Sequence, residues 1–440
     1  MDAFLTAYDP SDLPGGSIDP LGFERGYLLL ADKILPGMTN VANCPRYFGL
    51  LCVGAYLAGA DPGNSPREMH RTRQEGILRL ERLWVLANYL ARERHGGNLS
   101  GLRGVTYAER YVTQLTGQRG GSTDGDYRLL VRQVPYGVLG IYGAVAEGCK
   151  LIDRSTYTVT PGLGEPLAEA FLVGTATPVS VKKAVARKGE VSLSVLAEWG
   201  SRAYLWGKPG KDESRCIREM LHGNAVRSRF ASWLERLPTR NGENELGRLE
   251  RLAARLQSNV ADRDLWEAVA AILRYERCYR IVALALERLL FLCGERADTA
   301  GSVRVSDLGR DSILRNVREE LPAAVTEFTQ HFDSLKSDHL LDVAAAITDV
   351  RDFLVQAARA ACTCGSFLET ILLRHTDVQH GKFDRGRRKL PWLQVSGDRL
   401  ALTMTRIGGK PGEVTAPEEI ESHPYRLGAA DNWLKAARES

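Results

Sequence analysis

The sequence predicts a mainly α-helical, multi-helix protein with an internal winged-helix module and a small C-terminal β-hairpin. Three observations lead to this fold class. Apolar residues recur at helical spacing through most of the 440 residues. Asp126–Val173 has the order helix, short hairpin, helix. Pro391–Thr403 has two short β-rich runs around Ser396-Gly397-Asp398, which is typical of a hairpin.

The first 120 residues form a helical pattern that we take as an N-terminal domain (1–120). Leu21–Lys33 shows helical spacing and ends before Pro36-Gly37. Arg46–Leu57 is an apolar run interrupted only by Gly49 and Gly54, which suits a buried helix. Arg73–Leu90 carries an apolar stripe at intervals of three and four residues. The Gly/Ser/Asp-rich stretch Gln118–Asp126 then predicts a domain boundary.

The segment 121–175 is interpreted as the winged-helix-like module. Leu151-Ile152 and Tyr157–Val159 flank the polar turn Asp153–Thr156, which predicts a short hairpin. The helix that we expect at Pro166–Phe171 follows it. Thr160 is the expected N-cap residue of that helix, with Pro161 at its first position.

The expected recognition helix of this module does not have the composition of a base reader. Tyr136–Glu147 has glycine at every third position and neither Arg nor Lys, although sequence-reading helices present Arg, Asn or Gln to base edges. We therefore expect either contacts to nucleic-acid phosphates or docking to a protein. The cations available for phosphate contacts are Arg128, Arg132, Lys150 and Arg154.

Helical patterns continue through a third domain (176–300) and a C-terminal helical region (301–440) that carries a basic loop and the hairpin. Arg263–Leu292 is long and apolar on more than one face, which predicts a central helix. Two long helices are expected at Asp311–Phe332, which Pro322 should kink or divide, and at His339–Arg374. A last helix is expected at Ala429–Ala437.

Composition is that of an ordinary globular protein, with 44% hydrophobic and 25% charged residues. The net charge of +4 and the isoelectric point near 8.6 are compatible with nucleic-acid binding without indicating it. No apolar run approaches the roughly 20 residues that a membrane helix needs, and the N-terminus lacks the order of a signal peptide. The eight cysteines are scattered, so we expect buried, reduced thiols in a cytoplasmic protein.

Motifs for cofactor chemistry are missing from the sequence. It has no phosphate-binding G-x-x-x-x-G-K-[ST], no H-E-x-x-H and no G-x-S-x-G, and Cys362-Thr363-Cys364 is a single close-spaced pair. We therefore predict neither a cofactor nor a metal site.

One catalytic pattern is present at the end of the long helical stretch. Arg374 is followed six residues later by His380, which resembles the R-x(4–6)-H signature of the HEPN ribonucleases, a family of all-helical dimers. The resemblance implies that His380 would exchange a proton with a ribose hydroxyl and that Arg374 would hold the phosphate.

The same region supports an electrostatic interpretation. Asp377 and Asp384 lie among many more cations, and Gly381 and Gly386 predict a flexible loop beside an exposed Trp392. Such a loop suits a nucleic-acid backbone or an acidic protein surface, although an ordinary solvated loop would look the same. The loop's candidate nucleic-acid ligands are Lys382, Arg385, Arg387, Arg388 and Lys389.

The N-terminal region resembles a bacterial protein family. Leu35–Asn40, then Pro45–Phe48 and an apolar helix ending at Tyr56, is similar to the start of uncharacterised helical proteins encoded in anti-phage defence islands. Their pattern is P-G-[TS] followed by R-Y-F or R-Y-L, and here Met38 stands between Gly37 and Thr39. The resemblance implies an accessory role in a multi-protein defence complex beside an ATPase, helicase or nuclease.

The sequence therefore favours a non-enzymatic accessory subunit of an anti-phage defence or DNA-processing complex. It would bind DNA backbone without sequence specificity, a partner protein, or both. The alternatives are a HEPN-like ribonuclease that uses Arg374 and His380, and a winged-helix transcription regulator, which the glycine-spaced helix argues against.

Overall fold

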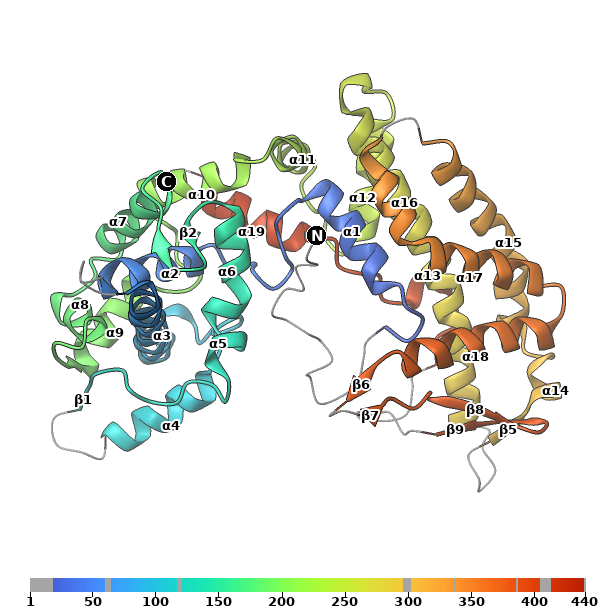
Figure 1. Ribbon diagram of the computed structural model, residues 1–440, viewed down its shortest axis with the longest axis horizontal. Helices are drawn as coiled ribbons and strands as arrows, with labels where there is room; N and C mark the ends of the chain where they lie inside the picture. The colour runs from blue at the N-terminus through green and yellow to red at the C-terminus, as the bar shows by residue number, and fades with distance from the viewer. Residues whose placement is uncertain are drawn as a thin grey trace. The chain divides into compact units, whose positions relative to one another are not determined.

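The computed structural model describes residues 19–59, 65–116, 121–295, 302–335, 338–384, 387–403 and 413–438. The side chains of Glu295, Asp384 and Arg387 lie outside this description. The described residues are mainly α-helical with a few short antiparallel strands, which confirms the predicted class (Figure 1).

The chain divides into two compact units. Among the described residues, unit 1 comprises 35–236 and 426–438, and unit 2 comprises 19–34 and 237–425. The predicted boundaries after residues 120 and 175 both lie within unit 1, and the boundary after residue 300 lies within unit 2. The division into four segments stays a prediction.

Unit 1 is a helical assembly with two small strand pairs. Its helices are α2 (Arg46–Ala58), α3 (Pro66–Ala91), η2 (Arg92–His95), α4 (Val105–Thr116), α5 (Gln133–Tyr136), α6 (Val138–Gly148), α7 (Gly164–Gly174), α8 (Val179–Val185), α9 (Leu193–Arg202), α10 (Lys211–His222), α11 (Ala225–Arg236) and α19 (Leu427–Ala437). Its strands pair as β1 (Ser122–Thr123) with β4 (Val191–Ser192) and β2 (Ile152–Asp153) with β3 (Thr158–Val159).

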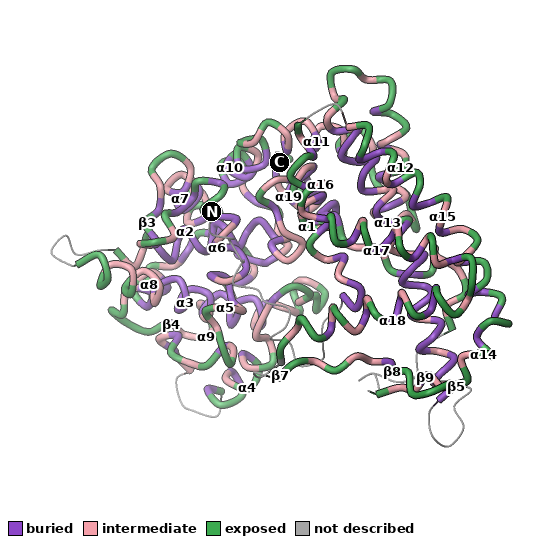
Figure 2. The backbone as a smooth tube through the Cα atoms, turned by 45° about the vertical axis from the view of Figure 1, so that its right-hand side comes forward, coloured by how far each residue is buried: buried purple, intermediate pink, exposed green. Residues whose placement is uncertain are grey.

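The core of unit 1 is built around α2 and α3, whose buried stretches are visible in Figure 2. α3 begins at Pro66, earlier than the apolar stripe predicted, because Ser65 and Glu68 form a capping box. The two helices approach closely at Gly54, where a Cβ atom would lie 2.6 Å from the Cα of Ile77. Trp84 is fully buried and donates to the carbonyl oxygen of Ala203 at 2.6 Å.

The hairpin and helix predicted after residue 150 are present, as β2, β3 and α7. α7 begins at Gly164, so Thr160 does not cap its first turn as we expected. The Thr160 hydroxyl instead bonds to the backbone of Lys150 and Leu151 and accepts from the N–H of Gly164. The identification of this segment as a winged helix stays a prediction.

The expected recognition helix is a core helix. α5 and α6 divide the predicted Tyr136–Glu147 helix at Gly137, and Val138, Leu139 and Tyr142 of α6 are buried against unit 1. Gly140 lets the backbone of α6 approach that of α5 closely, because a Cβ atom at this position would lie 1.9 Å from the carbonyl oxygen of Pro135. These buried side chains are in no position to enter a DNA groove, which agrees with the absence of base-reading residues.

Unit 2 is a second helical assembly with a three-stranded sheet. Its helices are α1 (Glu24–Ile34), α12 (Glu245–Leu256), η3 (Val260–Asp262), α13 (Arg263–Glu295), α14 (Val305–Leu308), α15 (Ser312–Asp333), η4 (Asp338–Leu340), α16 (Leu341–Ala346), α17 (Thr348–Ala360), α18 (Cys364–His380) and η5 (Pro417–Glu419). Its strands are β5 (Ser302–Arg304), β6 (Phe383–Asp384), β7 (Arg387–Arg388), β8 (Leu393–Ser396) and β9 (Arg399–Leu402).

α13 is the central helix of unit 2, as predicted, and packs against α1, α12 and α15 (Figure 2). α15 continues through Pro322 without division. The single helix predicted for His339–Arg374 is wrong, because the chain breaks after Ala346 and again before Cys364. Thr363 causes the second break by accepting from the N–H of Ser366 as the N-cap of α18.

The predicted C-terminal hairpin is confirmed as β8 and β9, which turn at Gly397 with a φ of +62°. β5 adds on the other side of β9, so the strand order is β5-β9-β8 and all pairs are antiparallel. β8 is consequently an edge strand of this sheet.

Six of the eight cysteines are buried, Cys362 is exposed and Cys364 is partly exposed, and all eight are free thiols. Burial raises the pKa of Cys44, Cys278 and Cys293 to about 12, so these thiols stay protonated and unreactive at neutral pH. None of the helices in the described part of the chain is both long and apolar enough to cross a bilayer.

Candidate functional site

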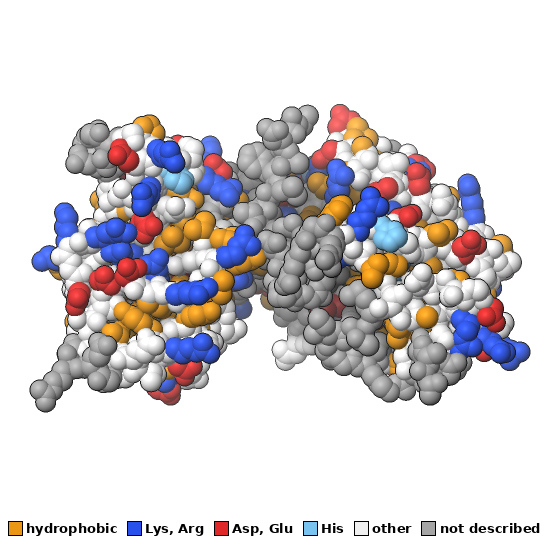
Figure 3. Space-filling model, turned by 60° about the horizontal axis from the view of Figure 1, so that its bottom comes forward, with side chains coloured by type: hydrophobic (Ala, Val, Ile, Leu, Met, Phe, Trp, Pro, Cys, Tyr) orange, Lys and Arg blue, Asp and Glu red, His pale blue; other side chains and the backbone are white. Residues whose placement is uncertain are grey.

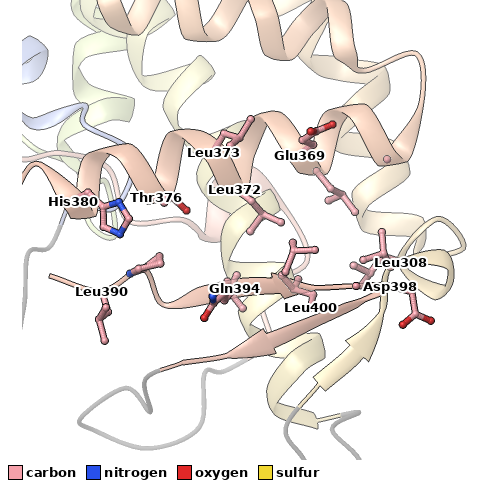
Figure 4. A pocket seen from close by; sticks show the side chains of 17 residues that line it. Leu308, Glu369, Leu372, Leu373, Thr376, His380, Leu390, Gln394, Asp398 and Leu400 are labelled. Carbon is pink, nitrogen blue, oxygen red and sulfur yellow. The ribbon is translucent and has the colours of Figure 1, made fainter.

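A largely apolar cavity lies in unit 2 between α18 and the β8–β9 hairpin (Figure 4). Its volume is about 640 Å³, which is within the range of sites that bind small molecules or peptide side chains. Leu372 and Leu373 of α18 lie along one side in Figure 4, and Gln394 and Leu400 lie along the other. Further apolar residues of the wall are Leu308, Leu368, Leu390, Pro391, Leu393 and Val395.

The ionisable side chains of the cavity lie at its two ends, and Gln394 lies between them. His380 and Thr376 lie at the end where α18 finishes, near Leu390 (Figure 4). Glu369 and Asp398 lie at the opposite end and are exposed. Leu390, at the first of these ends, directly follows Arg388 and Lys389 in the chain, whereas the opposite end is lined by two carboxylates.

His375 fixes the wall of the cavity from inside α18. Its ring is fully buried, Nδ1 lies 3.1 Å from the carbonyl oxygen of Pro20, and the N–H of Trp392 donates to Nε2 at 2.9 Å. Because Nε2 accepts, the proton of the neutral ring must be on Nδ1. Burial lowers the pKa of His375, which keeps the ring neutral and holds α18, the start of β8 and the N-terminal segment together.

We expect unit 2 to lose stability as the pH falls below about 6.5, the ordinary pKa of histidine. The folded state holds His375 with a lowered pKa, so the unfolded chain binds more protons and is favoured in acid. Burial lowers the pKa of His331 too, and it acts in the same direction. Native-state hydrogen exchange of α18 from about pH 7.5 to 5 measures the effect.

The variant that tests this assignment is His375→Gln, whose stability should depend less on pH than that of the wild type. His380→Gln, which removes an exposed imidazole from the same helix, is the control variant. An equal pH dependence in wild type and His375→Gln would contradict the assignment.

The structure gives Arg374 and His380 different surroundings, although both belong to α18. Arg374 donates to the carbonyl oxygen of Leu21 at 2.8 Å and to the carboxylate of Asp349 at 3.1 Å, and it lies over the ring of Phe353. Its guanidinium thus anchors the N-terminal segment to α18 and α17. His380 is exposed at the end of the cavity. Arg374 and His380 thus make separate contacts, and a ribonuclease role for the two residues stays a prediction.

The predicted basic loop contains a short hairpin. Phe383 pairs with Arg388, and the backbone of Asp384 pairs with that of Arg387. Arg388 is exposed, Lys389 is half-buried, and Arg385 and the side chain of Arg387 lie outside the described part of the chain. Lys382 is half-buried and donates to the carbonyl oxygen of Asp19, and burial lowers its pKa.

The predicted phosphate ligands of unit 1 come from different segments of the chain and differ in exposure. Arg128 and Arg132 are exposed before α5, Lys150 is exposed after α6, and Arg154 is half-buried in the turn between β2 and β3. Arg132 lies over the ring of Tyr136, 5.6 Å from its centroid. On the face of unit 1 that Figure 3 shows, Lys and Arg side chains are interspersed with hydrophobic ones rather than gathered in a single patch.

The sequence did not reveal the apolar cavity. Its walls come from α14, α18 and the β8–β9 hairpin, and β5, which directly precedes α14, pairs with β9 through Val303 and Leu400 among other residues. No local pattern predicts a contact between segments so distant in the chain. Leu373 and Leu390 are exposed in the structure, but nothing in the sequence distinguishes them from buried leucines.

Comparison of this chain with models of protein families, with curated proteins and with solved structures found no match.

Proposed function

We propose that the chain is a non-enzymatic accessory subunit of a bacterial anti-phage defence or DNA-processing complex, and that it holds nucleic acid through the β6–β7 hairpin. The observation that carries the second part is the pairing of Phe383 with Arg388. Residues directly opposite in an antiparallel pair project from the same face, so an aromatic ring and a guanidinium lie together there. Phe383 is 56% exposed and Arg388 is exposed.

An exposed aromatic ring beside a cation is suited to binding single-stranded nucleic acid. An exposed ring offers a surface on which an unpaired base stacks, and a neighbouring cation neutralises the phosphate beside it. Lys389 follows Arg388 directly and adds to the positive charge. The role in a defence or DNA-processing complex has a separate basis, the resemblance of residues 35–56. Within that stretch Arg46, Tyr47 and Phe48 are buried in the core of unit 1, so they support the fold rather than contact a ligand.

The test is the salt dependence of the affinity for a single-stranded oligonucleotide, measured by fluorescence anisotropy. Arg388→Ala should reduce the slope of log K against log salt by about 0.7, the value for one lost phosphate contact. Phe383→Ala should weaken binding by about 1–3 kcal/mol with little change in the slope, because stacking releases no counterion.

Arg315→Ala is the matched control, because Arg315 is exposed on α15 of the same unit and its removal changes the net charge equally. It should leave both quantities unchanged. If Arg388→Ala and Phe383→Ala behave like Arg315→Ala, the hairpin does not bind nucleic acid.

A further inference from the structure

The outer edge of β8 has unused backbone hydrogen-bonding groups. Thr403 donates its N–H to the carbonyl oxygen of Trp392 at 2.9 Å, and Leu393 pairs with Leu402. In an antiparallel ladder this makes Leu393–Leu402 and Val395–Leu400 the pairs without mutual hydrogen bonds. The N–H and C=O groups of Leu393 and Val395 therefore point away from β9. Among the described residues they meet no other hydrogen-bonding group.

The cavity runs along this edge. Leu393 and Val395 lie on one face of β8, and both line the cavity opposite α18. Leu393 is buried, but Val395 is 49% exposed, Leu373 is 57% exposed and Leu390 is 61% exposed. Sheet edges in natural proteins are commonly protected by charged residues or proline, and β8 has neither. The side chains of Leu393 and Val395 therefore line the cavity from the face of β8, while their backbone groups point outward in the plane of the sheet at its edge.

The charges at the two ends of the cavity differ in sign. Arg388 and Lys389 directly precede Leu390, which lines the cavity before the start of β8, whereas Glu369 and Asp398 line it toward the end of β8. A ligand that matches this surface is extended and apolar along its length. It carries negative charge beside the start of β8 and positive charge beside its end.

We propose that β8 binds an extended segment of a partner protein, which adds to the sheet as a fourth strand. The segment donates and accepts hydrogen bonds at Leu393 and Val395, and its alternate apolar side chains enter the cavity. An antiparallel strand would place a basic residue near Asp398 and an acidic residue near Lys389. This inference goes beyond nucleic-acid binding at the β6–β7 hairpin and does not depend on it.

The test uses the full chain and a synthetic peptide with blocked ends, Lys-Thr-Val-Ser-Leu-Thr-Val-Ser-Glu. Calorimetric titration should show binding. The peptide with its Lys and Glu exchanged should bind several-fold more weakly, because each charge then meets a like charge. A peptide that is N-methylated at the amides facing β8 should lose at least about tenfold in affinity, because the backbone bonds cannot form. Equal affinity of the N-methylated peptide would overturn the proposal.

The matched protein variant is Val395→Pro, which removes an outward N–H and leaves the β8–β9 hydrogen bonds intact. It should weaken peptide binding by about tenfold while the amide exchange of β9 stays as in the wild type. Leu373→Glu, on the opposite wall, should abolish binding without touching the sheet. If Val395→Pro and wild type bind the peptide equally, or if only a small apolar dye binds and Val395→Pro does not affect it, strand addition is wrong.

Discussion

We expect Glu213→Ala to destabilise unit 1 by about 3–5 kcal/mol, because it leaves a buried guanidinium without its counter-charge. Arg46 is 2% exposed and Glu213 is 1% exposed. Two nitrogens of Arg46 each lie 3.2 Å from one carboxylate oxygen of Glu213, and a third donates to the carbonyl oxygen of Tyr204 at 2.8 Å. The pair ties the start of α2 to the first turn of α10 and the end of α9.

Native-state hydrogen exchange measures this effect, since it reports on unit 1 separately from unit 2. Glu198→Ala is the control. Glu198 forms an exposed ion pair with Arg202 on α9, at 2.7 Å, and exposed pairs contribute about 0–1 kcal/mol. Glu213→Ala should lower the free energy of unfolding of unit 1 much more than Glu198→Ala does. Similar decreases in the two variants would contradict the role given to the buried Arg46–Glu213 pair.

Gly200→Ala should also destabilise unit 1, by about 1–3 kcal/mol. Gly200 lies in α9 where that helix packs on α3, and a Cβ atom would lie 1.9 Å from the carbonyl oxygen of Ala87. The obstacle is backbone, so the two helices must separate to admit a methyl group. Alanine normally favours a helix over glycine by about 1 kcal/mol, so a net loss of stability is diagnostic of this contact.

Gly148→Ala provides the comparison for this substitution. Gly148 ends α6 in the same unit, and a Cβ atom there would have no heavy atom within 4 Å. Thermal unfolding should show no loss for Gly148→Ala and a lower midpoint for Gly200→Ala. Equal midpoints for the two variants would mean that α3 and α9 do not pack in this way.

The sequence predicted those parts of the fold that depend on local patterns. The apolar periodicity located α2, α3 and α13, and the β-rich runs around Gly397 located the β8–β9 hairpin. The prediction failed where one side chain decided the outcome. Thr363 begins a new helix in the middle of an apparently continuous helical pattern. The free energy that such an N-cap contributes is small, so the apolar pattern alone does not reveal where the helix breaks.

The candidate site was predictable in part. The basic cluster was visible in the sequence, but the register that places Phe383 opposite Arg388 was not. The R-x(4–6)-H spacing suggested catalysis, whereas in the structure Arg374 donates hydrogen bonds to the carbonyl oxygen of Leu21 and to the carboxylate of Asp349. The cavity could not be predicted, because it depends on contacts between segments far apart in the chain, such as the pairing of β5 with β9, which local sequence patterns do not indicate.

Photocrosslinking from position 383 tests the proposal that the β6–β7 hairpin of unit 2 holds a nucleic-acid strand. A benzophenone-bearing phenylalanine replaces Phe383 in one variant and Leu341 in the control variant. Leu341 lies on α16 of the same unit and is 52% exposed. We expect a crosslink to a single-stranded oligonucleotide from position 383 that high salt abolishes, and none from position 341. No crosslink from position 383, or equal crosslinking from both positions, would contradict it.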